Sequence, residues 1–236
     1  MTPVAVALAG VVAGVLVLAL VALAITPAVT NAPSLVAGDA RAHGAPPCDT
    51  VPLKFQDALV ATEDSRYFWT PGIDPISVVR AAANAVLHGG DGGAATLEQQ
   101  LVKQLYFGGR SDTVALKAQE AVLAVKLDLH FSKQQILSMY ASTVYFGHGY
   151  WGLCAASRGY FGRTPDLLSW PQAAMLAGLV QAPSAYDPLV HPNAARARQE
   201  HVIDRLERTG RVSATQGAAI LRAPLDLVTS GTTQSS

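Results

Sequence analysis

Charged residues are scarce in this sequence, and neither sign is in excess. Only 14% of the 236 residues are Asp, Glu, Lys or Arg, against about 25% in an ordinary soluble domain. The 17 basic and 17 acidic residues cancel to a formal net charge of zero. A protein that binds nucleic acid through its phosphates needs a basic excess, so the composition argues against a nucleic-acid partner.

Cysteine is also scarce, since the chain contains two. Two cysteines cannot build a disulfide framework, and the sequence has neither the C-x-x-C nor the H-E-x-x-H spacing that is typical of zinc sites. Half of the residues are hydrophobic, which excludes intrinsic disorder for most of the chain. No metal site is therefore predicted from the residue pattern, and a folded core is expected.

The amino end is strongly apolar. From Pro3 to Ile25 there is no charged or strongly polar residue, and the first charged residue is Asp39. About 20 apolar residues in a helix span the roughly 30 Å hydrocarbon core of a bilayer. The run is longer than the apolar part of a usual signal peptide, and no Lys or Arg precedes it. Residues 1–26 are therefore predicted to be an uncleaved transmembrane anchor, with a cleaved signal peptide as the alternative.

Composition divides the rest of the chain into three parts. Residues 27–50 contain several Pro and Gly and few large apolar side chains, which predicts a stalk or linker. Residues 51–228 are numerous enough to bury a core of their own. Residues 229–236 are Thr, Ser, Gly and Gln, which predicts a disordered tail.

Helical periodicity and helix-ending residues are frequent in residues 51–228, whereas the alternation typical of strands is scarce. We therefore expect a mostly α-helical domain, in which Ser132 is a favourable N-cap. The predicted helices are Phe55–Tyr67, Pro75–Leu87, Thr96–Tyr106, Thr113–His130, Lys133–Tyr140, Pro171–Val180 and Asn193–Thr209.

Two glutamates lie where carboxylates are costly. Glu63 is followed by the aromatic cluster Tyr67–Trp69, and Glu120 falls beside the apolar stripe of its predicted helix. A buried carboxylate is destabilising unless it is paired or neutral. Lys117 is one turn before Glu120, so an ion pair at the edge of the core is one interpretation of that carboxylate. A catalytic role is the other.

The order of several segments resembles the motifs of the peptidoglycan glycosyltransferases, the transglycosylase domains of bifunctional penicillin-binding proteins and their monofunctional relatives. The resemblance extends from about Val51 to Arg208. The segments that carry it are Ala61–Phe68 with Gly72–Pro75, Gly92–Lys103, Lys117–Glu120 with Leu123–Ala124, Ile136–Tyr140 with Tyr145–Gly147, and Ala173–Leu179 with Gln181–Ser184.

This resemblance implies a lysozyme-like helical fold behind one membrane anchor, on the extracytoplasmic side of a bacterial cytoplasmic membrane. Members of the family polymerise lipid II. The growing glycan on undecaprenyl pyrophosphate is the donor, and the 4-hydroxyl of a new lipid II attacks it to form a β-1,4 bond with inversion. The expected partners are lipid II, the growing glycan, the membrane and other cell-wall synthesis proteins. The sequence contains neither S-x-x-K nor K-T-G, so a monofunctional enzyme is expected.

The resemblance also implies roles for individual residues. Glu63 matches the general base, which a sugar hydroxyl needs because it is a poor nucleophile. Glu120 matches a second carboxylate, which would hold a basic side chain or a metal near the pyrophosphate. Lys103 and Lys117 match cations for the pyrophosphate, and Arg110 is an additional candidate. The other expected substrate-binding residues are Asp64, Thr96, Gln99 and Gln100. Mg²⁺ or Mn²⁺ is implied by the resemblance alone.

Several positions depart from the family pattern. The residues concerned, with the usual family residue in parentheses, are Thr70 (His), Ala95 (Ser), Glu98 (Thr), Leu116 (Arg), Ser138 (Glu), Ser142 (Asn) and Gln172 (Glu). Glu98 brings a negative charge close to a pyrophosphate site unless it pairs with Lys103 or another cation. The alternative function is therefore a catalytically weak or inactive scaffold that binds lipid II or glycan within a cell-wall complex. A cleaving transglycosylase is disfavoured because it has no pyrophosphate for the motif lysines to bind.

The resemblance also leads to expectations about spatial arrangement. Glu63 and Glu120 should face one cleft, with Lys103 and either Lys117 or Arg110 at its floor. In an extracytoplasmic protein the two cysteines face an oxidising space. A disulfide between Cys48 and Cys154 would fix the stalk to the domain, and two buried thiols are the alternative. The apolar Pro75–Leu87 segment could contact the membrane interface or pack in the core.

Overall fold

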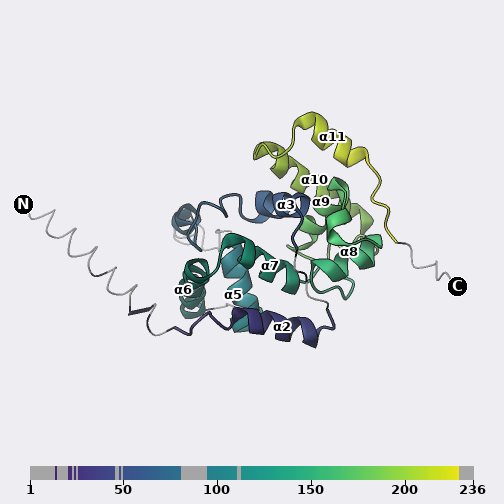
Figure 1. The fold of residues 1–236 in the computed structure, drawn as a ribbon. Helices are drawn as coiled ribbons and strands as arrows, with labels where there is room; N and C mark the ends of the chain where they lie inside the picture. The colour runs from purple at the N-terminus through teal and green to yellow at the C-terminus, as the bar shows by residue number, and fades with distance from the viewer. Residues whose placement is uncertain are drawn as a thin grey trace, which may run out of the picture.

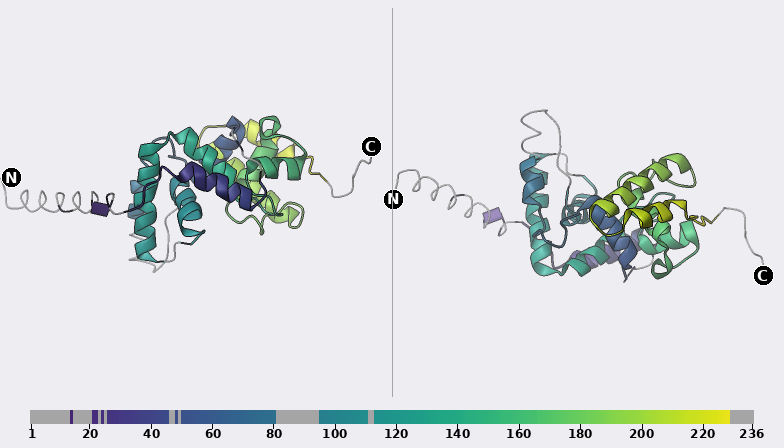
Figure 2. Two further views of the ribbon diagram at one scale, coloured as in Figure 1. Left: turned by 60° about the horizontal axis from the view of Figure 1, so that its bottom comes forward. Right: turned by 90° about the horizontal axis from the view of Figure 1, so that it is seen from above.

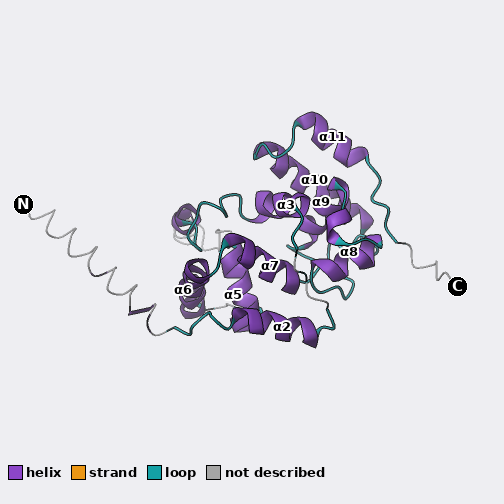
Figure 3. Cartoon of the chain, viewed as in Figure 1, coloured by secondary structure: helices purple, strands orange, loops and turns teal. Residues whose placement is uncertain are grey.

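The structure is a computed structural model that describes residues 26–45, 48, 50–80, 95–110 and 113–228, together with residues 14, 21, 22 and 24. This part of the chain is mostly helical, as predicted (Figures 1 and 3). The β pairing among the described residues is limited to one isolated antiparallel bridge, between Tyr145 and Trp151.

The described helices include every region in which the sequence predicts one. They are α2 (Ala32–Ala42), α3 (Leu53–Glu63), α5 (Leu97–Phe107), α6 (Val114–His130), α7 (Lys133–Thr143), α8 (Leu153–Phe161), α9 (Trp170–Leu179), α10 (Pro192–Arg208) and α11 (Ala214–Arg222), with a 3-10 turn at Pro165–Leu167. Residues 75–80 are also helical, and the remainder of the predicted helix Pro75–Leu87 lies outside the described residues.

Side-chain caps account for several of the helix starts. Thr96 and Ser132 each accept a hydrogen bond from the backbone N–H three residues ahead, and a Gln side chain at that position accepts one from the cap residue in return. The predicted N-cap role of Ser132 is thereby confirmed. Helix α3 ends at Glu63, four residues before the predicted end at Tyr67. It stops there because Asp64 leaves the helical conformation and its carboxylate accepts the backbone N–H of Leu97.

A helix, α2, occupies much of the segment whose composition predicts a stalk or linker. It packs against α5 and α7, with Ala32 and Ala40 buried at the contact. Pro33 lies in its first turn, where the missing N–H costs nothing, so this proline is compatible with the helix. The small side chains of this segment allow the close approach of α2 to its neighbours.

No helix among the described residues is long and apolar enough to cross a membrane. Most of the predicted anchor over residues 1–26, and all of the predicted tail over residues 229–236, lie outside the described residues.

The helices pack in two groups that meet near the end of α3 (Figures 1 and 2). Helix α9 is the centre of one group and contacts α3, α8, α10 and α11. This central position explains why all residues from Pro171 to Leu179 are buried. The second group contains α2, α5, α6 and α7. Residue Glu63, the last of α3, therefore lies where the two groups meet.

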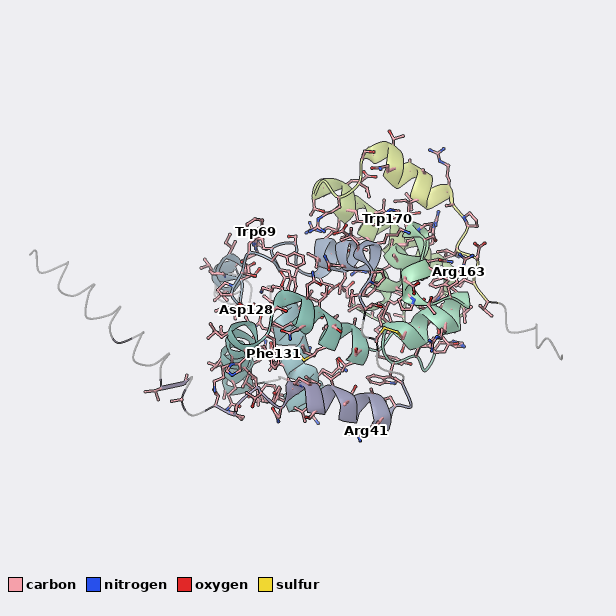
Figure 4. All side chains as sticks on the ribbon, in the orientation of Figure 1. Arg41, Trp69, Asp128, Phe131, Arg163 and Trp170 are labelled. Atoms are coloured by element: carbon pink, nitrogen blue, oxygen red, sulfur yellow. A yellow bond between two sulfur atoms is a disulfide. The ribbon has the colours of Figure 1, made fainter. Side chains whose placement is uncertain are left out.

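Of the two states that the sequence left open for Cys48 and Cys154, the structure has the disulfide, which joins the segment after α2 to α8 (Figure 4). Cys48 is buried, and its backbone carbonyl accepts hydrogen bonds from the hydroxyls of Ser138 and Ser142 at 3.3 and 3.2 Å. Both serines are positions at which the sequence departs from the family pattern. Their short side chains hold the disulfide-bonded segment against α7.

Candidate active site

Two cavities meet at Glu63. The larger has a volume of about 750 Å³ and is lined by residues that include Gln100, Lys103 and Tyr140. The smaller has a volume of about 300 Å³ and is lined mainly by polar residues. Glu63 and Ala95 line both cavities, so the carboxylate is at their shared boundary.

Both oxygens of the Glu63 carboxylate are held by neighbouring helices. Arg198 of α10 donates from Nη2 to Oε1 at 3.2 Å, and Gln100 of α5 donates from Nε2 to Oε2 at 3.3 Å. Gln100 is itself positioned by the hydroxyl of Tyr140, which donates to its Oε1 at 2.7 Å. The side chain of Glu63 is only 14% exposed. The carboxylate is therefore fixed in orientation while it remains in contact with both cavities.

Burial raises the pKa of Glu63 above its ordinary value. The hydrogen bond from Gln100 and the positive charge of Arg198 act in the opposite direction, and the neighbouring Asp64 adds a smaller upward effect. A carboxylate with a raised pKa is a stronger base than an exposed one. Glu63 consequently has the properties required to accept a proton from a hydroxyl group.

Asp64, Thr96 and Gln99, three of the predicted substrate-binding residues, build the start of α5. Asp64 Oδ2 accepts the N–H of Leu97 at 3.3 Å, and the Thr96 hydroxyl donates to the carbonyl of Gly72 at 2.7 Å. Gln99 Oε1 accepts the N–H of Thr96 at 3.0 Å as part of the capping box. Asp64 and Thr96 also line the smaller cavity, whereas Gln99 lines neither.

Cationic side chains line each cavity. Lys103 lines the larger one, and three guanidinium groups, those of Arg66, Arg80 and Arg205, line the smaller. Arg66 forms an ion pair with Asp74, and its hydrogen bond lowers the pKa of Asp74 to about 2. Each cavity therefore contains positive side chains for an anionic ligand, and the carboxylates of Asp64 and Asp74 also line the smaller one.

Three other predicted site residues are not among those that line these two cavities. Glu120 belongs to the buried face of α6 and is 5% exposed, and Lys117 is one turn earlier on the same helix. Arg110 follows the end of α5. None of the three lines the larger or the smaller cavity. The structure thus brings Asp64, Thr96, Gln100 and Lys103 to Glu63, and Glu120 is placed in the packing of α6 beside α5.

Residues 32–207 match the family model described as "Transglycosylase". The chain belongs to the transglycosylase family. It is 41% identical over 179 residues to penicillin-binding protein 1A of Streptococcus oralis, a match that covers 74% of this chain and 28% of that protein. It is 36% identical over 210 residues to a Cupriavidus necator protein named "Putative transglycosylase", covering 88% of this chain and 90% of that protein.

A crystal structure of penicillin-binding protein 1A from Haemophilus influenzae also matches this transglycosylase. The TM-score is 0.45 and the sequence identity 21%, and the match covers 75% of this chain and 17% of that one. The chain spans about a quarter of the length of the streptococcal penicillin-binding proteins 1A that it matches.

This transglycosylase pairs Glu98, an unusual residue in its second motif, with Lys133 of α7. Glu98 is fully buried, and the Lys133 Nζ lies 2.6 Å from its Oε1 and 2.6 Å from Oδ1 of Asp128. The same ammonium donates to the carbonyl of Thr70 at 2.6 Å. Glu98 therefore does pair with a cation, and this cation is Lys133 rather than Lys103.

Sequence reasoning missed two residues that position the Glu63 side chain, Arg198 directly and Tyr140 through Gln100. Arg198 lies on α10, and 135 positions separate it from Glu63. No local pattern predicts such a contact. Tyr140 is part of the fourth motif, so its membership of the site could have been expected from the resemblance.

No group of three or more His, Cys, Asp or Glu side chains in the described part of the transglycosylase could hold a metal ion. The described cationic side chains that line the two cavities include Lys103 at the larger one and the arginines of the smaller one.

Proposed function

We propose that this transglycosylase is a peptidoglycan glycosyltransferase that polymerises lipid II into β-1,4 glycan strands, with inversion and with release of undecaprenyl pyrophosphate. Glu63 is the general base. The proposal rests chiefly on the position of Glu63: a mostly buried carboxylate with a raised pKa lies at the boundary of two cavities, and each cavity has its own cations.

The two cavities suit the two substrates, because donor and acceptor each carry a pyrophosphate. The larger cavity has room for several sugar rings and takes the growing strand, with Lys103 near the leaving pyrophosphate. The smaller cavity takes the new lipid II, with its pyrophosphate bound by Arg66, Arg80 and Arg205. Glu63 is then adjacent to the acceptor hydroxyl and to the donor anomeric carbon.

The reaction is a single displacement in this scheme. Glu63 accepts the proton of the 4-hydroxyl as that oxygen attacks the anomeric carbon, and the bond from that carbon to the pyrophosphate breaks. Arg198 and Gln100 keep the carboxylate oriented toward the hydroxyl. Positive side chains stabilise the charge that accumulates on the leaving group.

The proposal places the protein in a bacterial cytoplasmic membrane as a single-pass, monofunctional enzyme with a lysozyme-like domain on the extracytoplasmic side. Its substrates are lipid-linked, so anchoring raises their effective concentration. Trp69, Ile76 and Val79 are 88%, 56% and 69% exposed. Trp69 and the helical residues 75–80 lie near α6, at the end of the molecule opposite α11 (Figures 2 and 4). We propose that this end contacts the lipid surface, and that other cell-wall synthesis proteins are partners.

The test is glycan synthesis from labelled lipid II by the full-length protein in detergent, with Mg²⁺ present. The wild type should form polymer, and Glu63→Gln should lower the rate at least about 100-fold, because general base catalysis is lost while the shape of the side chain is kept. Glu200→Gln, on the exposed surface of α10, is the matched control and should retain activity.

Polymer formation by Glu63→Gln at the wild-type rate would remove Glu63 from the role of base. If neither protein forms polymer but both still bind lipid II, the chain is instead the lipid II- or glycan-binding scaffold that the departures from the family pattern suggest.

A further inference from the structure

We propose that α2 adds a carbohydrate subsite to the larger cavity, formed by Asp39, His43 and Trp151, and that it binds an N-acetylhexosamine ring of a β-1,4 glycan. The proposal rests on the proposed function in one respect, namely that the strand in this cavity is such a glycan. These three residues lie outside the motif residues to which a catalytic or substrate-binding role is assigned above.

Three aromatic rings line this part of the larger cavity, and Trp151 contacts the other two. The ring of His43 stacks on that of Trp151, with centroids 3.7 Å apart and an angle of 15° between the planes. The ring of Tyr145 lies 4.8 Å from Trp151, centroid to centroid. All three residues line the cavity. Aromatic surface of this kind packs against the C–H groups of a sugar ring, while polar groups beside it set the orientation of the ring.

The polar group beside the rings is the carboxylate of Asp39. Its Oδ1 lies 3.6 Å from Nδ1 of His43, which is also 2.9 Å from the Asp39 backbone carbonyl. Its Oδ2 is buried and has no hydrogen-bond partner among the described residues. A buried acceptor without a donor is unfavourable, and a sugar hydroxyl is the donor that it lacks. Rotation about the Cβ–Cγ bond can turn either oxygen toward a bound ring.

Helix α2 is held firmly enough to present these residues in a fixed position. The Cys48–Cys154 disulfide and the bonds from Ser138 and Ser142 to Cys48 secure the chain after the helix. At its start, the Tyr106 hydroxyl donates to Oδ1 of Asn31 at 2.9 Å. A preorganised subsite loses less entropy on binding than a mobile one.

The location of this subsite gives it a function in elongation. It shares one cavity with Glu63 and Lys103, so a strand whose end is at Glu63 can extend to the aromatic rings. The subsite therefore binds the part of the growing strand that has already been made. It retains the strand between additions, and its loss should give shorter products.

The test uses tetra-N-acetylchitotetraose, a soluble β-1,4-linked N-acetylhexosamine oligomer, titrated into the full-length protein in detergent and followed by calorimetry. The wild type should bind it, and His43→Ala and Trp151→Leu should each raise Kd about tenfold, as removal of a central contact does. Arg41→Ala is the control, because this exposed residue is on α2 but does not line the larger cavity. Asp39→Asn is nearly isosteric and should weaken binding without unfolding the protein.

Absence of tetrasaccharide binding by the wild type, or an unchanged Kd in variants that keep the wild-type melting temperature, would overturn the subsite. Failure of the proposed function is distinct from this outcome. If the wild type binds the tetrasaccharide through His43 but forms no polymer, the result supports the subsite and contradicts the polymerase role. Conversely, variants that polymerise lipid II with unchanged Kd for the tetrasaccharide and unchanged product length would support the polymerase role and contradict the subsite.

Discussion

At the scale of the residue, the chemistry of the site depends on how Arg198 and burial oppose each other at Glu63. Burial favours the protonated carboxyl group and Arg198 favours the carboxylate, and burial is the larger effect. The base acts only when it is ionised. The rate of glycan synthesis should therefore rise with pH through the pKa of Glu63, at a pH above that of an ordinary glutamate.

Replacement of Arg198 by Met should move this rise to higher pH. The substitution removes the positive charge that stabilises the ionised form, so the pKa of Glu63 increases further. Initial rates of polymerisation measured from pH 5 to 9 report the midpoint directly. Arg208→Met is the control, because Arg208 is exposed on the same helix and pairs with Asp204. Coincident profiles for Arg198→Met and the wild type would show that Arg198 does not set the basicity of Glu63.

At the scale of the element, Lys133 connects α7 to α5 and to the end of α6. Its ammonium contacts Glu98 and Asp128, and its aliphatic stem brings the charge within 4.7 Å of the centre of the Tyr67 ring. Glu98 is fully buried, whereas Asp128 is 16% exposed. Of the two carboxylates, Glu98 therefore depends more on the lysine.

Lys133→Met should destabilise the protein by about 3 kcal/mol at neutral pH, because it leaves the Glu98 charge buried without its partner. The pKa of Glu98 is already raised by burial and lowered by Lys133, so removal of the lysine raises it further. Protonation then relieves the cost, and the destabilisation should be smaller at pH 5 than at pH 8. Urea unfolding at the two pH values measures this, with Asp128→Asn as the milder control. An equal loss of unfolding free energy at both pH values would contradict the role of Lys133 as the partner of the Glu98 charge.

The turn that contains Gly72 requires a glycine for two separate reasons. Its φ is +75°, and a Cβ at this position would lie 2.4 Å from the backbone carbonyl oxygen of Ala124 in α6. Gly109 has a similar φ of +81° with no atom within 4 Å of an added Cβ. Left-handed backbone strain costs about 1–3 kcal/mol for a residue other than glycine. Gly72→Ala should therefore lower the melting temperature clearly more than Gly109→Ala, and equal shifts would mean that α6 yields to the added methyl group.

Much of the helical framework can be predicted from the sequence, because caps and glycines mark the helix ends locally. The start of α7 at Ser132 is one example. Helix α2 was missed because a Pro- and Gly-containing composition favours a linker, and only its packing on α5 and α7 favours the helix. At the site, Glu63 and Lys103 could be predicted from motifs. The partners Arg198 and Lys133 could not, since each contact joins residues far apart in the chain.

At the scale of the whole molecule, the disulfide links the segment after α2 to α8 across 106 residues of sequence. Closing a loop of this length restricts the unfolded chain strongly, by up to about 5 kcal/mol in the chain-entropy view. It also joins the α2 wall of the larger cavity to the helix group that contains α9.

The double substitution Cys48→Ser and Cys154→Ser should therefore lower the free energy of unfolding by about 2–5 kcal/mol. Thermal unfolding in detergent, with and without a thiol reductant, checks this. Reductant should lower the melting temperature of the wild type and leave that of the double variant unchanged. If the reductant opens the disulfide but leaves the melting temperature of the wild type unchanged, the packing of α2 alone holds this side of the larger cavity in place.

The adjacent carboxylates Glu63 and Asp64 lie at helix ends of opposite polarity. Glu63 is the last residue of α3, where the helix dipole presents partial negative charge, whereas Asp64 accepts an N–H at the start of α5, where the partial charge is positive. Burial raises the pKa of both, but the two dipoles act on them in opposite directions. The end of α3 therefore favours the protonated form of Glu63, whereas the start of α5 favours the ionised form of Asp64, so the backbone distinguishes two carboxylates that are neighbours in sequence.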